Sequence, residues 1–366
     1  MQRVVFLYGG KSGEHEVSLR SAASIVAHLD AARFEAVLVG IGKDGVWRLE
    51  EGGPATRDPL EPLRLGPGPR VLVVPSGGLA VERREGIEAL PCDCVFPVLH
   101  GSYGEDGTIQ GLLECADLPY VGAPVLGSAL GMDKEKAKLL WIQAGLPVVP
   151  FMTVRRADLG DADPEGTVRR LAGEISSRFG WPAFVKPACG GSSVGASKAS
   201  DAADLGRALA AALEWDDKAL IEPFVDGREI ECSVLGNDKA RAFPPGEIVP
   251  SHEFYDYEAK YIDPDGARLV IPADLDATIS ESIRSIAVRA YEALELAGMA
   301  RVDFFVRRTT SELLLNEVNT IPGFTSISMY PKMCESGGLG YSELVTQLVE
   351  LALERREGRK RLRYSF

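Results

Sequence analysis

The chain has few of the residues that build metal centres or disulfide frameworks. It contains four histidines and six cysteines in 366 residues, and the cysteines form no CxxC pair and no regular ladder of spacings. Structural zinc sites and disulfide-rich folds both depend on closely spaced ligands of these types. We therefore expect no structural zinc site, and reduced thiols of the kind found in a cytoplasmic protein.

Positive charge and long apolar runs are also scarce. The chain carries 40 Lys and Arg against 53 Asp and Glu, a net charge of -13, which disfavours binding to nucleic acid or to an anionic membrane. The opening apolar run, residues 4–8, has only the length of a strand, so we expect neither a secretory signal nor a membrane span. The one basic stretch, residues 355–363, is interpreted as the solvated end of a helix and its tail.

What the chain does contain is typical of a globular protein with two or three domains, since 45% of its residues are hydrophobic and 25% are charged. In its first part, strands are predicted at residues 4–7, 37–39, 71–74 and 94–98, and a helix at 21–29. This order predicts an open α/β unit, whose ligands normally bind beyond the carboxyl ends of the strands. The segment 52–70, in which nine of nineteen residues are Gly or Pro, is predicted to be a surface excursion of that unit.

The first domain boundary is expected at a helix with clear end signals. Asp133 is a good N-cap, and the helix should end at Gly145 because Pro147 follows closely. A strand at 184–186, a glycine-rich loop and a helix come next, and a helical stripe follows at 279–294. The predicted units are residues 1–132, 133–222 and 223–366.

The most informative pattern is a predicted hairpin with acidic side chains, residues 301–306 and 313–319. If the hairpin is symmetric about Thr310, then Asp303 lies opposite Glu317, and Arg301 lies opposite Asn319. Because side chains alternate between the two faces of a strand, these four polar residues should share one face. Val302, Val306, Leu314 and Val318 should point the other way, into a core. Two carboxylates and a carboxamide in one place suit magnesium that carries nucleotide phosphates, although a solvated polar face is the alternative.

A candidate phosphate loop lies between Gly190 and Gly195, where small residues offer successive backbone amides. A plain flexible turn is the alternative for this loop. It is not a Walker A loop, and Gly10-Lys11-Ser12 does not complete one either, because Val5 occupies the required glycine position. The nucleotide, if there is one, must be held by another architecture.

Residues 247–264 are predicted to form a lid. The segment mixes aromatic rings with acids, shows no clear period, and contains Lys260 and Tyr261. A long surface loop would have the same composition, so both interpretations stay open.

Seven blocks of the sequence, taken in order, resemble the D-alanine–D-alanine ligase family. They are residues 9–18 (GGKSGEHEVS), 99–107 (LHG followed by GEDG), 132–134 (MDK), 185–187 (VKP), 191–195 (GSSVG), 254–261 (FYDYEAKY) and 316–320 (NEVNT). The resemblance covers nearly the whole chain. It implies an ATP-grasp fold, in which two α+β units clamp the nucleotide behind an N-terminal open α/β domain.

The resemblance implies that the chain uses ATP to join two D-alanines for peptidoglycan synthesis, through an acyl phosphate of the first D-alanine. Glu14 would hold the first ammonium in a hydrogen-bonded trio with Ser192 and Tyr261. His100 would orient the first carboxylate.

The same resemblance assigns the later step. Arg301 and the amide of Gly323 would stabilise the oxyanion of the tetrahedral intermediate. Ser328 and the backbone at Met329 would take the second carboxylate.

The nucleotide and metal residues are implied in the same way. The triphosphate would be neutralised by Lys134, Lys186 and Lys260, and the remaining ATP contacts would come from Ser193, Glu222, Val225 and Glu229. Two magnesium or manganese ions would be held by Asp303, Glu317 and Asn319, with Glu317 bridging. A homodimer is implied by the resemblance alone.

Two departures from the family pattern modify these expectations. Many relatives carry a larger polar pair where this chain has Cys189-Gly190, which predicts a looser loop and a reactive thiol. Pro223 offers neither an N–H nor a lysine side chain, so adenine should rely on the Glu222 carboxylate, the Pro223 carbonyl and the Val225 amide.

Two other functions remain as alternatives. One is a ligase that prefers D-lactate as second substrate, and Tyr261 is an argument against it. The other is a non-catalytic nucleotide-binding protein. The argument against this alternative is that the set of polar residues on the hairpin is complete: Arg301, Asp303, Glu317 and Asn319.

Overall fold

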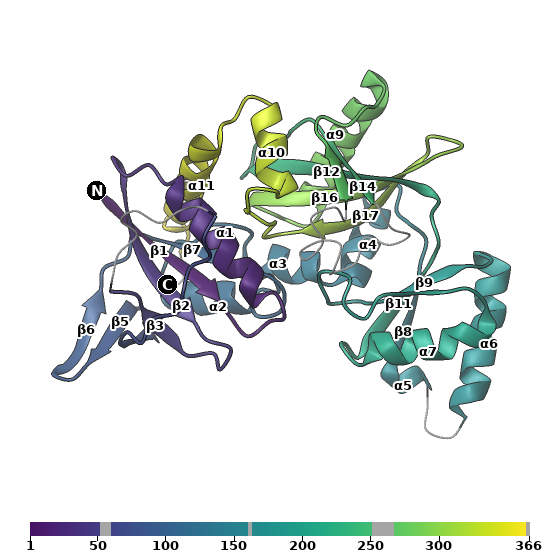
Figure 1. Ribbon diagram of the computed structural model, residues 1–366, viewed down its shortest axis with the longest axis horizontal. Coiled ribbons are helices and arrows are strands. Elements are labelled where there is room, and N and C mark those ends of the chain that lie inside the picture. Colours follow the sequence, from purple (N-terminus) through teal and green to yellow (C-terminus); the bar gives the residue numbers. More distant parts are fainter. Residues whose placement is uncertain (52–59, 160–162, 251–266, 364–366) are drawn as a thin grey trace.

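The computed structural model describes residues 1–51, 60–159, 163–250 and 267–363 of the chain. Figure 1 shows three sheets in a row, with the N-terminal sheet at one end, a small central sheet at the other and the C-terminal sheet between them. The architecture is mixed α/β and α+β, as the sequence predicts.

The N-terminal sheet has seven strands in the order β6-β5-β4-β3-β2-β1-β7. β1 (Gln2–Gly9) runs parallel to both β2 (Phe34–Ile41) and β7 (Cys94–Val98), and its side chains from Val4 to Tyr8 are fully buried. An uninterrupted apolar run is what a strand covered on both faces requires. The remaining strands are β3 (Trp47–Leu49), β4 (Arg70–Val74), β5 (Gly78–Arg83) and β6 (Gly86–Leu90).

Part of the predicted N-terminal unit is different in the structure. The strand expected at 71–74 is β4, which pairs antiparallel with both β3 and β5. The pairing with β5 follows from a tight turn that returns the chain at once. The parallel α/β unit is therefore limited to β1, β2 and β7. In the described part of the Gly- and Pro-rich excursion, Leu63 is buried and its N–H donates to the carbonyl of Leu19, which anchors the segment.

Helix α1 (His15–Ala27) begins six residues before the predicted start at 21. Its first turn looks polar in the sequence, but His15 and Ser18 are buried and hydrogen-bonded. His15 Nδ1 lies 2.7 Å from the carbonyl oxygen of Gly10, and Ser18 Oγ accepts from the N–H of Gly9 at 2.7 Å. These contacts fix the loop between β1 and α1. The other helices of this part are α2 (Thr108–Cys115) and α3 (Val125–Met132).

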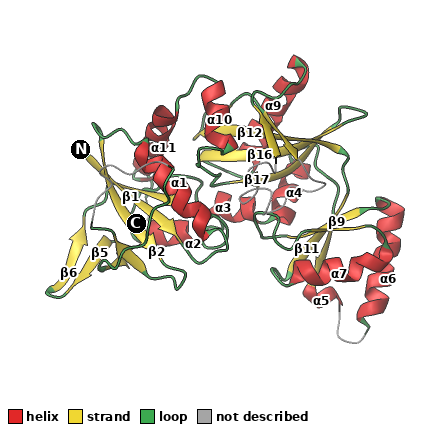
Figure 2. Ribbon diagram, viewed as in Figure 1, coloured by secondary structure: helices red, strands yellow, loops and turns green. Residues whose placement is uncertain are grey.

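The central sheet has four antiparallel strands in the order β10-β9-β11-β8. They are β8 (Met152–Arg155), β9 (Ala183–Pro187), β10 (Ser197–Ala199) and β11 (Lys218–Pro223). Figure 2 shows helices α5 (Arg156–Leu159), α6 (Pro164–Arg178) and α7 (Ala202–Leu213) gathered with this sheet at the outer end of the molecule. The core between them is apolar and includes Val185, Ile175 and Leu209.

The C-terminal sheet is built on β12 (Gly227–Gly236), which pairs antiparallel with β16 (Gly298–Arg307) along its whole length. The other strands are β13 (Arg241–Ala242), β14 (Gly246–Pro250), β15 (Ala267–Val270) and β17 (Leu313–Asn319). The first residues of the predicted lid, 247–250, therefore belong to β14. The other lid residues, 251–264, lie outside the described part of the chain. Helices α9 (Ala277–Ala293) and α4 (Lys134–Gln143) cover one face of this sheet with a shared core.

Two helices pack against a part of the molecule other than their neighbour in the sequence. Trp141 of α4 is fully buried and donates through Nε1 to the carbonyl of Ala290 in α9, so α4 packs with the C-terminal sheet although it precedes the central one. The chain ends with α10 (Met329–Ser336) and α11 (Tyr341–Arg359), and α11 packs against the N-terminal domain.

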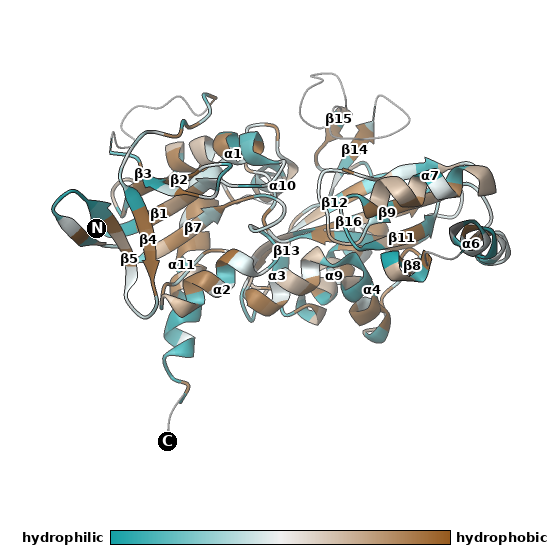
Figure 3. Cartoon of the chain, turned by 90° about the horizontal axis from the view of Figure 1, so that it is seen from below, coloured by the Kyte–Doolittle hydropathy of each residue, from teal (hydrophilic) through white to brown (hydrophobic). Residues whose placement is uncertain are grey.

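The basic end of α11 follows the sequence interpretation only in part. Figure 3 shows its last turns as hydrophilic and projecting from the body of the molecule. Arg355, in contrast, donates to the carbonyls of Tyr120 and Gly122 at 2.7 and 2.5 Å, so this cation anchors the helix. None of the helices that the structure describes combines the length and apolar character needed to cross a lipid bilayer.

Candidate active site

A cavity of about 140 Å³ lies where the N-terminal and C-terminal parts meet the glycine-rich loop of the central part. Segments far apart in the sequence contribute to its wall. Among the lining residues are predicted site residues from all of these segments: Glu14, His100, Lys134, Ser192, Arg301, Glu317, Asn319, Gly323, Ser328 and Met329. The fold therefore brings together most of the residues expected at the two amino-acid positions.

The remaining predicted residues are placed differently. Lys260 and Tyr261 lie outside the described residues. Ser193 follows Ser192 in the loop, and Glu229 lies on β12 opposite Ile248. Asp303 accepts a hydrogen bond from Arg301. Lys186 and Glu222 face each other on neighbouring strands of the central sheet, and the side chain of Val225 packs in a small apolar cluster with Val149 and Leu314.

The register of the β16–β17 hairpin is confirmed at its polar positions. Arg301 pairs with Asn319 and Asp303 pairs with Glu317, so all four side chains lie on one face. This face lines the cavity through Arg301, Glu317 and Asn319.

Beyond these positions the predicted register is wrong. A bulge follows Asp303, so that Phe304 pairs with Leu315 and Asn316 has no partner residue in the ladder. Leu314 therefore packs with Phe305 and not in the core that holds Val302. The bulge has a consequence that the sequence pattern does not reveal: Asn316 accepts a hydrogen bond from Lys186 Nζ at 3.1 Å.

Arg301 is held by two acids. Its Nε and Nη2 donate to the two carboxylate oxygens of Asp303 at 2.8 and 2.7 Å, and its Nε lies 3.1 Å from Glu231 Oε2. Burial disfavours the charged guanidinium, but the two acids outweigh it and raise the pKa of Arg301 well above its ordinary value. A permanent cation with a fixed direction suits an oxyanion that develops during a reaction.

Glu231 is a site residue that the sequence analysis missed. A signal was present, because β12 alternates Ile230, Cys232 and Val234, which lie in the core, with polar residues on the other face. That period places Glu231 beside Glu229 on the face toward the cavity.

The donor set of this face fits a hard divalent cation. Asp303, Glu317 and Asn319 offer carboxylate and amide oxygens, which are the ligands that magnesium and manganese prefer. Within the described ranges, no group of three His, Cys, Asp or Glu side chains is placed to hold a metal ion. A cation here would therefore depend on the amide of Asn319, whose Oδ1 accepts from the N–H of Ile321 at 3.2 Å.

The glycine-rich loop reaches the N-terminal domain through Ser192, whose hydroxyl donates to the Glu14 carboxylate. Ser192 and Ser193 both have left-handed backbone conformations, with φ of 50° and 59°. A Cβ at Gly191 would lie 2.9 Å from Glu14 Oε2, so a larger residue there would force the Glu14 carboxylate to move. The contact between Glu14 and Ser192 matches two members of the predicted trio.

His100 is buried, and both of its ring nitrogens have hydrogen-bond partners. Its Nδ1 lies 3.0 Å from the carbonyl oxygen of Ile321, and its Nε2 lies 3.0 Å from Ser21 Oγ. The carbonyl must accept, so Nδ1 carries the proton and Nε2 accepts from the hydroxyl. Burial lowers the pKa of His100.

Glu105 is a second buried acid in the cavity wall. Burial and the nearby Glu14 carboxylate raise its pKa to about 8. It accepts from the backbone N–H of Gly101 at 2.5 Å. Glu105 therefore ties together the loop that also carries His100.

Gly323 and the start of α10 form the far wall. Ser328 Oγ accepts from the N–H of Thr325 at 2.9 Å, and Met329 begins the helix. The amides at a helix N-terminus favour a carboxylate, which is the group predicted for this position. A Cβ at Gly323 would lie 2.8 Å from Ser328 Oγ, so a larger residue there would displace the Ser328 hydroxyl.

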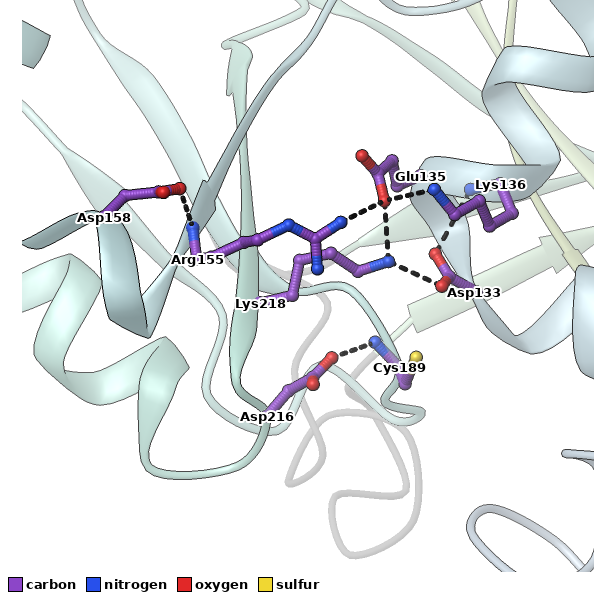
Figure 4. Close-up of polar contacts among 8 residues, drawn as sticks. All are labelled: Asp133, Glu135, Lys136, Arg155, Asp158, Cys189, Asp216 and Lys218. Carbon is purple, nitrogen blue, oxygen red and sulfur yellow. Dashed lines mark hydrogen bonds and ion pairs between the residues drawn. The ribbon is translucent and has the colours of Figure 1, made fainter.

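The joint between α4 and the central sheet fixes Lys134, whose Nζ lies 2.5 Å from the carbonyl of Gly190 and 3.7 Å from Glu317. Figure 4 shows Lys218 reaching Asp133 and Glu135, the residues on either side of Lys134, at 2.5 and 2.8 Å. The backbone closes the same ring, because Ala188 accepts from the N–H of Lys134 and donates to the carbonyl of Lys218.

The structure disfavours the thiol reactivity that the sequence predicts for Cys189. Its N–H donates to Asp216 Oδ2 at 2.7 Å, as Figure 4 shows, which fixes the start of the loop. Burial, reinforced by the Asp216 and Asp133 carboxylates, raises the pKa of the thiol to about 12. The thiol is therefore protonated at neutral pH and is a poor nucleophile.

Comparison with known proteins gives a consistent result over the chain. The family model described as D-ala D-ala ligase N-terminus matches residues 3–123, and the one described as D-ala D-ala ligase C-terminus matches residues 140–350. A D-alanine--D-alanine ligase from Treponema denticola is 48% identical over 96% of both chains. D-alanine--D-alanine ligase A from Escherichia coli is 45% identical, again over 96% of both chains.

Solved structures agree in fold. The D-alanine-D-alanine ligase from Coxiella burnetii matches with a TM-score of 0.83 and 37% identity, covering 98% of this chain and 96% of its own. The VanG D-Ala:D-Ser ligase from Enterococcus faecalis matches with a TM-score of 0.81 and 34% identity, covering 96% of this chain and 99% of its own.

Proposed function

The chain belongs to the D-alanine–D-alanine ligase family and has its ATP-grasp fold, and we propose that it joins two D-alanines into D-alanyl-D-alanine while ATP is converted to ADP and phosphate. The observation that carries the proposal is the cavity itself. It places the Glu14–Ser192 pair, Arg301 and the Glu317 face around one space large enough for small amino acids. The dipeptide would serve peptidoglycan synthesis.

The first step activates one D-alanine. Its ammonium is held by Glu14, and its carboxylate attacks the γ-phosphorus of ATP, so that an acyl C–O–P bond forms as the β–γ bridge breaks and ADP leaves. Positioning and charge neutralisation carry most of the catalysis of such transfers. Lys134 and Lys186 supply positive charge for the triphosphate, together with Lys260.

The second step forms the peptide bond. The amine of the second D-alanine, after losing its proton, attacks the acyl carbonyl, and phosphate leaves with the C–O bonding pair. Arg301 and the Gly323 amide stabilise the oxyanion of the tetrahedral intermediate. The N-terminus of α10, at Ser328 and Met329, holds the second carboxylate.

Asp303, Glu317 and Asn319 are the residues that would hold two magnesium or manganese ions. When bound, the ions would neutralise charge on the nucleotide phosphates. We propose Ser193, Glu222, Val225 and Glu229 as the remaining nucleotide contacts. Tyr261 would complete the hydrogen-bonded trio with Glu14 and Ser192.

We also propose a cytoplasmic homodimer. The location is supported by the use of ATP and by six cysteines that are all free thiols, as expected in a reducing compartment. The dimer is supported by family membership alone. Sedimentation of the purified chain would test it.

The function is tested with the purified chain, ATP, magnesium and D-alanine, by following phosphate release and detecting the dipeptide by mass. We expect D-alanine-dependent turnover and little turnover with L-alanine, because the ammonium contact to Glu14 sets the direction of the methyl group. Equal turnover of the two enantiomers would refute the proposal. D-lactate and D-serine, each offered with D-alanine, show whether the second position prefers another nucleophile.

A further inference from the structure

A buried lysine outside the cavity is the feature that the proposed mechanism does not use. Lys138 lies in the middle of α4 with its side chain fully buried, and a fully buried lysine is rare unless it is paired. Its Nζ lies 3.0 Å from Glu222 Oε1. The attraction of this ion pair counteracts the cost of burying the ammonium.

Glu222 is shared between two cations. Its other oxygen, Oε2, lies 2.9 Å from Lys186 Nζ, and Lys186 is itself only 8% exposed. Burial alone would raise the pKa of Glu222, but the two lysines outweigh burial and lower it, so the acid stays ionised. A row of alternating charges thus runs from Lys138 in the core, through Glu222, to Lys186, the residue proposed to contact the triphosphate.

The charge balance of this row depends on Lys138. If Glu222 faced Lys186 alone, the buried pair would be neutral, and Lys186 would offer a polyanion little net attraction. With Lys138 present, one carboxylate is shared by two ammonium groups and the row keeps one net positive charge. At the low effective dielectric of such a site, a unit charge has a large effect on phosphate binding.

We propose that Lys138 is a positioning residue for ATP: it neutralises Glu222, so that Lys186 keeps its charge for the triphosphate. A plain structural ion pair is a weaker account, because replacing a whole buried ion pair by apolar residues of similar volume is often neutral or stabilising. Burial lowers the pKa of Lys138 to about 8, and Glu222 is the main group that opposes this effect. The fold thus retains a lysine whose charge is costly to bury.

This inference rests on the proposed function, since it requires a nucleotide phosphate at Lys186. The test compares four proteins: wild type, Lys138→Met, the double variant Lys138→Met/Glu222→Gln, and Lys136→Met as control. Lys136 lies on the same helix, is 46% exposed, and pairs with Glu135 at 3.1 Å (Figure 4). Lys136→Met therefore removes the same charge as Lys138→Met, but from a solvated position.

Binding is measured with ADP, and with tripolyphosphate and adenosine as separate probes of the phosphate and base positions. We expect Lys138→Met to weaken ADP and tripolyphosphate by at least about tenfold and to leave adenosine within about twofold. The KM for ATP should rise in parallel, while the KM for D-alanine should not. Lys136→Met should resemble the wild type.

The double variant separates charge balance from damage to the fold. It removes the carboxylate together with its cation and restores one net positive charge at Lys186, so tripolyphosphate binding should return to within about threefold of wild type. It also keeps the proposal testable if Lys138→Met alone does not fold. Tripolyphosphate binding that stays weak in the double variant, or that is unchanged in Lys138→Met, would overturn the proposal.

The outcomes also distinguish this inference from the proposed function. A wild-type protein that binds no ADP and makes no dipeptide would overturn both. Normal dipeptide synthesis by the wild type, with adenosine and not tripolyphosphate affected in Lys138→Met, would overturn only the role of Lys138.

Discussion

Replacing Glu317 by Gln is the sharpest test of the hairpin face. Glu317 lies opposite Asp303, and its carboxylate is 3.7 Å from Lys134 Nζ. Gln has nearly the same shape, so the substitution removes one negative charge and leaves the β16–β17 pairing intact. The Glu317 side chain is 32% exposed, and a partly solvated ion pair of this kind contributes about 0–1 kcal/mol to stability.

The effect on catalysis should be much larger than the effect on stability. Removing one preorganised electrostatic group typically costs about 3 kcal/mol in the barrier, which is about a hundredfold or more in rate. We therefore expect Glu317→Gln to lose at least about a hundredfold in kcat while its free energy of unfolding changes by less than about 1 kcal/mol. Two measurements decide this: steady-state phosphate release with ATP, magnesium and D-alanine, and urea denaturation.

Glu312→Gln is the matched control, since Glu312 belongs to the same hairpin but pairs with Arg307 at 2.7 Å on an exposed surface. It should keep nearly full activity. If Glu317→Gln kept half of the wild-type rate, the polar face of the hairpin would be a solvated surface, and its assignment as the metal and phosphate site would be wrong. A large loss in both variants would point to damage to the hairpin.

The other predictions concern the joint, a buried acid and the lid. Lys218→Met should lower the free energy of unfolding, measured by urea denaturation, by about 2–4 kcal/mol, because Asp133 and Glu135 lose a nearly buried partner. A clearly smaller change would mean that the ion pairs of Lys218 do not hold α4 on the central sheet. Glu105 has a folded-state pKa raised to about 8 by burial and Glu14, so the folded state holds a proton that the unfolded state loses near 4.5, and stability should fall as pH rises from 4.5 to 8. Glu105→Gln should reduce this fall by an amount on the order of a few kcal/mol. If the free energy of unfolding fell equally with pH in the wild type and in Glu105→Gln, the raised pKa would be wrongly assigned to Glu105. Tyr261→Phe should cost only about 0.5–1.5 kcal/mol in the barrier but raise the ratio of phosphate released to dipeptide formed, and an unchanged ratio would mean that the hydroxyl does not protect the acyl phosphate from water.

The sequence alone determined the features that depend on local periodicity and end signals. The apolar run of β1 required a strand buried on both faces, and Asp133 caps α4, its side chain accepting from the N–H of Lys136. The period-2 alternation placed Arg301 and Asp303 on the same face as Glu317, and the observed pairing agrees. These signals are readable because they act between residues that are close in the chain.

The tertiary structure decided which polar residues are buried, and there the local signals were insufficient. The polar first turn of α1 is helical because Ser18 and His15 find backbone partners in the preceding loop. Cys189 was expected to be reactive, but burial beside Asp216 keeps its thiol protonated. Neither outcome is visible from the residue and its neighbours in sequence.

The bulge at Asn316 and the burial of Lys138 show the physical reason. A lysine in a helix is ordinary surface composition, and it becomes a buried charge only because β11 brings Glu222 to 3.0 Å from the other side of the joint. One extra residue in β17 turns Leu314 away from the core and Asn316 toward Lys186. Both effects are set by the energy of partners that are distant in the chain, since the cost of burying a polar group depends on what the fold places against it.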